Sequence, residues 1–209
     1  MRAACRVVLL ARLIRACALA LPGTLQCAAT PAAAAGPAAD SGSLDQLLQL
    51  LAARRHGHVA FNEVHRLAML DRPLQSSGEL LYEAPDRLEK RTLEPKPEEL
   101  LLDHGVLTAR RGGHSRVLAL RDYPQIVPFL ESIRATLAGD RAALERYFAV
   151  QYSGSLEHWT LELTPADPEV ARAVDHIRIT GERDAVRSVE IHETDGDGSV
   201  LTVGAPVSP

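Results

Sequence analysis

Two groups of side chains in this sequence have residue types that bind metal ions in other proteins. His56 and His58 are two residues apart, a spacing that would place two zinc ligands on the same face of a strand, but the sequence offers no third ligand beside them. The run from Asp195 to Gly198, Asp-Gly-Asp-Gly, begins like a calcium-binding loop, yet the later oxygen ligands and the closing glutamate are missing. We therefore predict surface histidines in the first case, a hairpin turn in the second, and no metal site.

Three carboxylates, Glu98, Glu99 and Asp103, are close enough in sequence to be considered as an acid–base pair. Neighbouring residues of a strand point to opposite faces, so we expect solvated charges instead. The sequence also contains no Gly-x-Ser-x-Gly elbow, no Gly-x-x-x-x-Gly-Lys phosphate loop, no Gly-x-Gly-x-x-Gly turn and no His-Glu-x-x-His helix. We predict that the protein is not an enzyme and that it uses no cofactor.

The first 35 residues have the order of a secretory signal peptide. Four arginines and no acidic residue fall within positions 1–15, an apolar stretch follows at 16–21, and small residues lead to Ala35. We predict export to the periplasm with cleavage near Ala35. Residues 36–42 are then an Ala/Pro linker, and residues 43–205 form one domain.

Cleavage near Ala35 would remove all three cysteines, Cys5, Cys17 and Cys27. An exported domain without disulfides needs an ordinary apolar core, which about 170 residues can supply. Cys27 leaves one alternative open, an outer-membrane lipoprotein anchored through that cysteine. The preceding triplet, Thr-Leu-Gln, fits a lipidation site poorly because glutamine stands where a small residue is expected.

The chain after residue 35 is acidic and aliphatic. Loss of the four leader arginines leaves 19 basic residues against 27 acidic ones, and no Lys/Arg cluster remains that would bind nucleic acid. Hydrophobic residues make up 46% of the sequence but aromatic residues only 4%. A packed globular unit is expected. Its smooth aliphatic faces would suit flexible acyl chains better than a ligand that stacks on rings.

Periodicity predicts one helix followed by a run of strands. Leucines at 44, 47, 48 and 51 give a helix from Ser43 one apolar face, and the helix is expected to end near Gly57. Six extended runs separated by short turns follow, at 59–70, 78–83, 87–93, 98–103, 106–111 and 116–120. Strands joined so closely indicate an antiparallel meander and not parallel units with crossover helices.

Three helical pieces and four more strands are expected in the second half. Pro124 opens a helix that Pro128 should kink or restart, Asp140 caps a second, and Asp167 with Pro168 opens a third. Alternating residues predict strands at 159–164, 177–180, 186–193 and 199–203. About ten antiparallel strands with few helices define an α+β fold. Such a sheet must curl, and its apolar face encloses either a filled core or an aliphatic cavity.

The turn residues of the first hairpins resemble those of a known family. The string from Ser77 to Leu88, SGELLYEAPDRL, followed by Pro95 and the segment 98–105, resembles the LolA-like outer-membrane lipoprotein carriers, and the order of elements agrees over residues 43–203. The resemblance implies a strongly curved, unclosed β-barrel whose helices form a lid over a hydrophobic cavity for acyl chains. It also implies a monomeric, non-catalytic periplasmic carrier. Such a carrier takes lipoproteins from an inner-membrane ABC transporter and delivers them to an outer-membrane receptor.

One position departs from the family pattern. The arginine that latches the lid in the family stands before the first turn proline, where this chain has Ala84. Arg87 is nearby but should face away from the interior. This departure leaves open a carrier of another lipid, such as a glycolipid or a polyene ester. A LolB-like receptor is a separate alternative, which depends on lipidation of Cys27.

Alternation along the strands and helices identifies candidates for the cavity wall. Lys90 is ambiguous, because either its ammonium lies near the cavity mouth and pairs with an anionic lipid head group, or it faces solvent after a bulge. The complete set of lipid-binding candidates is Leu44, Leu47, Leu48, Leu80, Tyr82, Ala84, Leu88, Lys90, Ile126, Phe129, Ile133, Trp159 and Leu161.

Overall fold

The structure is a computed structural model that describes residues 41–124 and 126–207. The predicted signal peptide, most of the linker and Cys27 lie outside these residues. Eleven strands form one sheet in the order β6-β5-β4-β3-β2-β1-β11-β10-β9-β8-β7. They are β1 His56–Arg66, β2 Leu74–Glu83, β3 Arg87–Glu94, β4 Glu98–Asp103, β5 Val106–Arg111, β6 His114–Ala119, β7 Phe148–Gly154, β8 Trp159–Pro165, β9 Val174–Glu182, β10 Ala185–Glu193 and β11 Gly198–Pro206.

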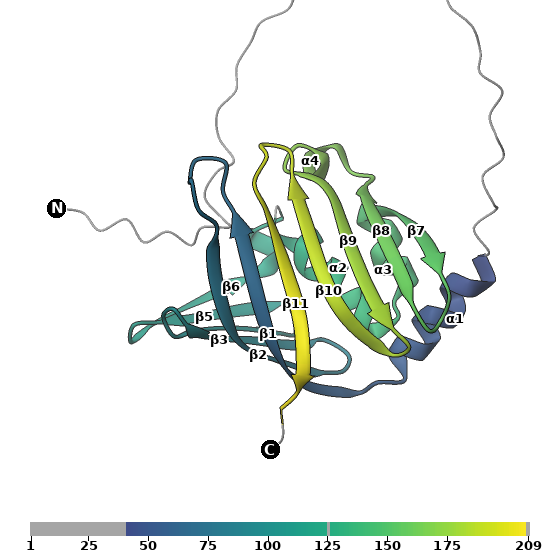
Figure 1. Ribbon diagram of the computed structural model, residues 1–209, viewed down its shortest axis with the longest axis horizontal. Helices are drawn as coiled ribbons and strands as arrows, with labels where there is room; N and C mark the ends of the chain where they lie inside the picture. Colours follow the sequence, from purple (N-terminus) through teal and green to yellow (C-terminus); the bar gives the residue numbers. More distant parts are fainter. Residues whose placement is uncertain (1–40, 125, 208–209) are drawn as a thin grey trace, which may run out of the picture. The chain divides into compact units, whose positions relative to one another are not determined.

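The sheet consists of two antiparallel meanders joined in the middle. Strands β1 to β6 form one and β7 to β11 the other, and β1 pairs with β11. Because β6 and β7 are the two edges, the sheet is unclosed, as predicted. Figure 1 shows β1, β11, β10, β9 and β8 side by side, whereas β3, β5 and β6 turn away behind them at the left. The sheet is thus strongly curved, and α2 and α3 lie on its inner side.

Strand β7 is the element that the sequence patterns missed. The helix before it ends at Tyr147 and the strand begins at the next residue, Phe148. The apolar positions Phe148, Val150 and Tyr152 do alternate, but the first of them also continues the helical pattern. The first helix is also shorter than expected. It ends at Ala52, because β1 already begins at His56.

The helices begin and end where capping residues allow. They are α1 Ser41–Ala52, the 3-10 helix η1 Leu120–Asp122, α2 Val127–Ala138, α3 Arg141–Tyr147 and α4 Pro168–Ala171. Pro128 lies in the first turn of α2, so it restarts the helix and introduces no kink. The carboxylates of Asp140 and Asp167 accept backbone N–H bonds at 3.0 and 2.7 Å and cap α3 and α4, as predicted.

Gly139 ends α2 in the left-handed region, with φ of 66°. A Cβ at this position would lie 2.2 Å from the carbonyl oxygen of Leu48 in α1. Glycine therefore serves both the turn and the close approach of the two helices.

The apolar residues of the inner side form two separate core clusters. In the larger one, the leucines of α1 pack against inward residues of β7 to β10, among them Trp159, Leu161 and Ile179. In the smaller one, Leu102, Leu107 and Leu120 are buried together. Helix α2 contacts both clusters, because Phe129 packs against the larger, and Val127 and Leu130 pack against the smaller.

Because Leu47 is fully buried between α1 and the sheet, its truncation should destabilise the fold. We expect Leu47→Ala to lower the free energy of unfolding by about 2–5 kcal/mol, since it removes packed methyl groups and leaves a cavity. Val117→Ala is the control, because 67% of Val117 is exposed on the edge strand β6, and it should change stability by less than about 0.5 kcal/mol. Urea unfolding followed by circular dichroism measures both. Equal losses would contradict the assignment of the larger cluster as the core.

Candidate functional site

The inner face of the sheet between the two core clusters is the candidate functional site. The register aligns inward residues across neighbouring strands, so that Leu80 on β2 faces Lys90 on β3, which faces Leu100 on β4. Leu80, Leu88, Leu100, Leu201 and Val203 all lie on this face and remain partly exposed. We call the inward residues of β11 and β1 to β4, apart from Leu102 of the smaller cluster, the open inner face. Its aliphatic side chains are covered less completely than those on either side.

The sequence-predicted lipid contacts occupy three different environments. Leu44, Leu47, Leu48, Trp159 and Leu161 are packed in the larger core cluster. Leu80, Tyr82, Leu88 and Lys90 share the open inner face, as cross-strand pairs show. Of the helical candidates, Ile126 is buried, whereas Phe129 and Ile133 are partly exposed. That these residues touch a lipid stays a prediction.

Ala84 and Arg87 occupy the turn region that the family pattern singles out. Ala84 is partly buried, and its backbone N–H donates to the carbonyl oxygen of Arg55 at 2.9 Å. Arg87 follows the turn and forms ion pairs with Glu83, Glu89 and Asp103. Its guanidinium is therefore engaged with carboxylates of the hairpins and does not replace a lid-latching arginine.

Lys90 faces inward on β3, and its pairing with an anionic lipid head group stays a prediction. A register shift between β2 and β3 does occur at Ser77 and Gly78, but the alternation of β3 places Lys90 on the inner side beyond it. Its ammonium pairs with the carboxylate of Glu63 and lies 5.0 Å from the ring centroid of Phe61. Lys90 is therefore already compensated by an internal carboxylate.

Glu63 is the functional-site residue that sequence reasoning missed. It is only 8% exposed, and its carboxylate accepts a bond from Ser76 Oγ at 3.2 Å and lies 3.1 Å from His65 Nε2. Burial acts to raise the pKa of Glu63, but hydrogen bonding to His65 and the charge of Lys90 outweigh it and hold the pKa at about 2. Alternation along β1 could have placed Glu63 on the same inner face as Phe61. It could not have identified Lys90 and Ser76 as partners of Glu63, because these contacts depend on the register between strands.

Tyr82 places a second buried polar group on the open inner face. The residue is 9% exposed, and its buried hydroxyl has no hydrogen-bond partner among the described residues. Burial raises the pKa of Tyr82, while the positive charges of Arg55 and Arg134 act in the opposite direction. Buried hydroxyls nearly always have a partner, so this one is unusual.

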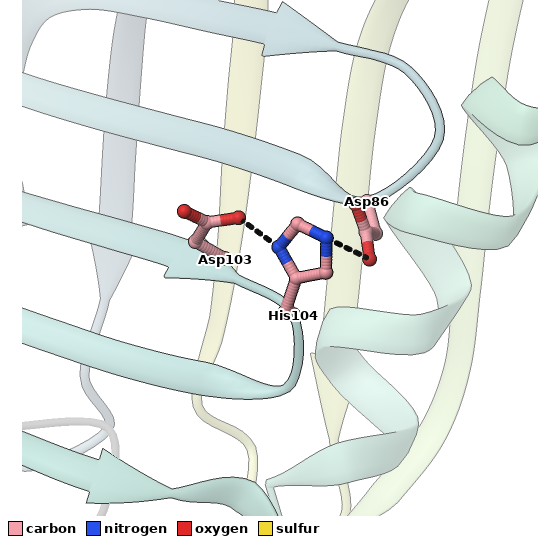
Figure 2. Close-up of side chains that lie close together, drawn as sticks. All are labelled: Asp86, Asp103 and His104. Carbon is pink, nitrogen blue, oxygen red and sulfur yellow. Dashed lines mark hydrogen bonds and ion pairs between the residues drawn. The ribbon is translucent and has the colours of Figure 1, made fainter.

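Three ionisable side chains meet where two hairpin turns come together. Figure 2 shows His104, from the β4–β5 turn, between Asp103 and Asp86. Its Nδ1 lies 2.6 Å from Asp103 Oδ1 and its Nε2 3.9 Å from Asp86 Oδ2. The hydrogen bond to Asp103 raises the pKa of the exposed His104. The three could offer metal ligands, but their mutual contacts already account for the arrangement as an ionic link between turns.

A cleft of about 710 Å³ lies apart from the open inner face, between α2, α3 and the β4–β5 turn. Charged side chains dominate its polar lining, and Glu131 and Asp140 both pair there with Arg134. None of the predicted lipid contacts lines it. The full lining is His104, Gly105, Val106, Ala119, Leu120, Arg121, Val127, Glu131, Arg134, Asp140, Ala142, Ala143, Arg146 and Tyr147.

Most of the other polar residues singled out in the sequence have structural partners. His58 Nε2 lies 3.0 Å from Glu79, and Glu98 and Glu99 pair with Arg111 and Arg110 of the next strand. The Asp-Gly-Asp-Gly run is the β10–β11 turn, as expected. Its Asp197 carboxylate accepts the backbone N–H of Ala68 at 2.7 Å, which ties this turn to the β1–β2 loop.

No helix within residues 41–124 and 126–207 combines the length and the apolar character needed to cross a membrane.

Comparison with known families identifies the class of this protein. Residues 33–207 match the family model described as outer membrane lipoprotein carrier protein LolA-like. The match covers most of the chain, so the protein belongs to the LolA-like family. A search of curated proteins found no match.

Several solved structures resemble this fold at low sequence identity. The LolA superfamily protein NE2245 from Nitrosomonas europaea is 12% identical, with a TM-score of 0.41, over 80% of this chain and 94% of that one. The Pseudomonas aeruginosa MucA/MucB complex is 14% identical, with a TM-score of 0.44, over 79% of this chain and 58% of that one. A putative outer membrane lipoprotein-sorting protein domain from Vibrio parahaemolyticus is 9% identical, with a TM-score of 0.43, over 79% of this chain and 91% of that one.

The lowered pKa of Glu63 predicts a specific acid sensitivity. A carboxyl whose pKa is about 2 in the folded protein and about 4.5 in the unfolded chain stabilises the fold above pH 4.5, and this contribution is lost as the pH falls toward 2. Between pH 7 and pH 3 the loss should be about 2 kcal/mol. In Glu63→Gln, the pH dependence of the unfolding free energy should be flatter by that amount.

Urea unfolding at a series of pH values measures the difference between Glu63→Gln and wild type. Glu94→Gln is the matched control, because Glu94 is exposed at the end of β3, where water solvates its carboxylate. This variant should keep the wild-type pH dependence. A slope in Glu63→Gln equal to that of wild type would rule out Glu63 as a source of acid sensitivity.

Proposed function

We propose that this protein is a periplasmic carrier that binds acyl chains on the open inner face and shuttles lipoproteins from the inner to the outer membrane. The observation that carries the proposal is the row of partly exposed aliphatic side chains on the open inner face, namely Leu80, Leu100, Leu201 and Val203, with Leu88 at its border against the smaller cluster. Membership of the LolA-like family supports it. The donor would be an inner-membrane ABC transporter and the acceptor an outer-membrane receptor.

The energetics and the contacts of α2 favour a carrier over an enzyme. Each methylene group that leaves water contributes roughly 0.8 kcal/mol, so a single acyl chain can replace several apolar contacts of a covering helix. Helix α2 meets both core clusters through apolar residues, namely Phe129, Val127 and Leu130. An acyl chain offers the same kind of contact. The carrier would act as a monomer without a cofactor, and no reaction is assigned to it.

A carrier of another lipid is the second candidate, and two observations favour it. Ala84 stands where family carriers have the lid arginine, and the pair of Lys90 and Glu63 places compensated charges on the binding face. A glycolipid or a polyene ester would present more polar atoms to such a face than saturated chains do. Lipid extracted from protein purified from its own periplasm distinguishes the two cargoes.

Substitutions on opposite faces of β4 test the binding face directly. Leu100 points inward and its neighbour Leu101 outward, and both are partly exposed. Leu100→Asn should reduce the fraction of protein carrying acylated cargo by roughly tenfold, since it places an amide against the acyl chains. Leu101→Asn should leave that fraction unchanged. Native mass spectrometry of periplasmic protein measures the bound fraction, and equal loading of both variants would contradict the proposed face.

Processing of the N-terminus tests the location of the carrier. If the chain is exported as proposed, intact-mass analysis of the mature protein should show a first residue near Gly36 and no lipid. A mature protein that begins with a diacylglyceryl-modified Cys27 would instead establish the LolB-like receptor. Replacing Cys27 by serine is the control, because it should abolish lipidation in the second case and change nothing in the first.

A further inference from the structure

The hydroxyl of Tyr82 lies on the inner side of β2, where it has a donor to offer and no acceptor. Tyr82 is more than nine-tenths buried, and its oxygen is closed to solvent and unpartnered among the described residues. Leaving such a group unsatisfied is costly, and a phenylalanine would fill the same space without that cost. A tyrosine in this position is therefore not explained by packing alone.

The surroundings of the hydroxyl favour an oxygen acceptor from a ligand. Across the strands Tyr82 faces Gly57 on one side and Leu88 on the other, and neither side chain can accept a hydrogen bond. The positive charges of Arg55 and Arg134 act on Tyr82, and the negative charge of Asp86 acts in the opposite direction. Arg134 is held by Glu131 and Asp140, so it contributes a fixed positive potential. A ligand oxygen with partial negative charge would satisfy both the hydroxyl and this potential.

The position of Tyr82 relates this donor to the proposed acyl-chain site. Leu80 is the next inward residue of β2, about 7 Å along the strand, and Leu88 is the cross-strand neighbour of Tyr82. A chain lying against these two leucines would bring its head end beside the hydroxyl. Arg134 belongs to α2, so this helix lies within electrostatic reach of the hydroxyl.

We propose that the Tyr82 hydroxyl donates a hydrogen bond to the carbonyl oxygen of a bound acyl chain, so that the site selects acyl chains over ether-linked or unsubstituted hydrocarbon chains. The inference rests on the proposed function and names the chemistry of its ligand. A carbonyl oxygen is present both in the esters of a lipoprotein and in a free fatty acid. Each source keeps the carbonyl next to the first methylene of the chain.

Matched ester and ether lipids test the inference on the full protein. The probes are dihexanoyl phosphatidylcholine and its dihexyl ether analogue, which share head group and chain length but differ in the carbonyl groups. Calorimetric titration below their critical micelle concentrations should show that wild-type protein binds the ester about tenfold more tightly. Tyr82→Phe should remove this preference and leave the affinity for the ether unchanged.

A structural role for Tyr82 would give a different pattern. Tyr82→Phe should stabilise the empty protein in urea unfolding, because it removes an unsatisfied hydroxyl. If the hydroxyl had only a structural role, Tyr82→Phe would stabilise the protein without changing its preference between ester and ether. Tyr152→Phe is the control, since Tyr152 lies on the inner side of β7, beside Leu161, and should keep the wild-type preference.

The remaining outcomes separate the inference from the proposed function. Equal affinity of wild-type protein within both matched pairs, ester against ether and decanoic acid against decanol, or a preference that survives in Tyr82→Phe, would overturn the inference while leaving the carrier function standing. Failure of every probe to bind would overturn the carrier function and the inference together. Decanoic acid against decanol forms a third arm. A preference confined to the acid and lost in Tyr82→Phe would identify a free fatty acid as the source of the carbonyl.

Discussion

The structure depends on one constraint, which is that a single curved sheet has an apolar inner face and few helices with which to cover it. Helix α1 and its leucines cover β7 to β10 and complete a packed core there. Over β2 to β4 the cover is thinner, and inward aliphatic residues such as Leu80 and Leu100 stay partly exposed. The stability of the fold and the proposed binding of acyl chains are therefore assigned to different halves of the same face.

The ion pair of Glu63 on β1 with Lys90 on β3 places Lys90 among the aliphatic residues of the open half and the buried Glu63 at its border. Such a pair is often no more stabilising than aliphatic residues of similar size would be. The pair matters for its position. It places two charges that neutralise each other between the larger and the smaller core cluster, both of which contact α2. With His65 and Ser76 also engaged, the Glu63 carboxylate stays charged although it is buried.

Local patterns predicted most of the fold because turns and caps are local. Strands β4 and β5 were predicted with their observed bounds, since His104 and Gly105 mark the turn between them, and the caps at Asp140 and Asp167 were found in the same way. Strand β7 escaped because Phe148 satisfies two periodicities. The site was less accessible from the sequence. Alternation indicated that Lys90 could face inward, but its partner Glu63 lies two strands away, and only cross-strand register brings them together.

Although Ala84 replaces the lid arginine, other contacts hold α2 in place. At its C-terminal end, Gly139 brings α2 against the backbone of α1, and Arg134 binds Asp140, the N-cap of α3. At its N-terminal end, Val127 and Leu130 meet the smaller core cluster through aliphatic contacts. An acyl chain can exchange with aliphatic contacts without breaking a hydrogen bond, whereas the C-terminal contacts of α2 include an ion pair and a close backbone approach. The latch that family carriers place on the sheet is therefore not the only way to hold such a helix. Here polar contacts fix the end of α2 next to α1 and α3, and apolar contacts hold the end that covers the smaller cluster.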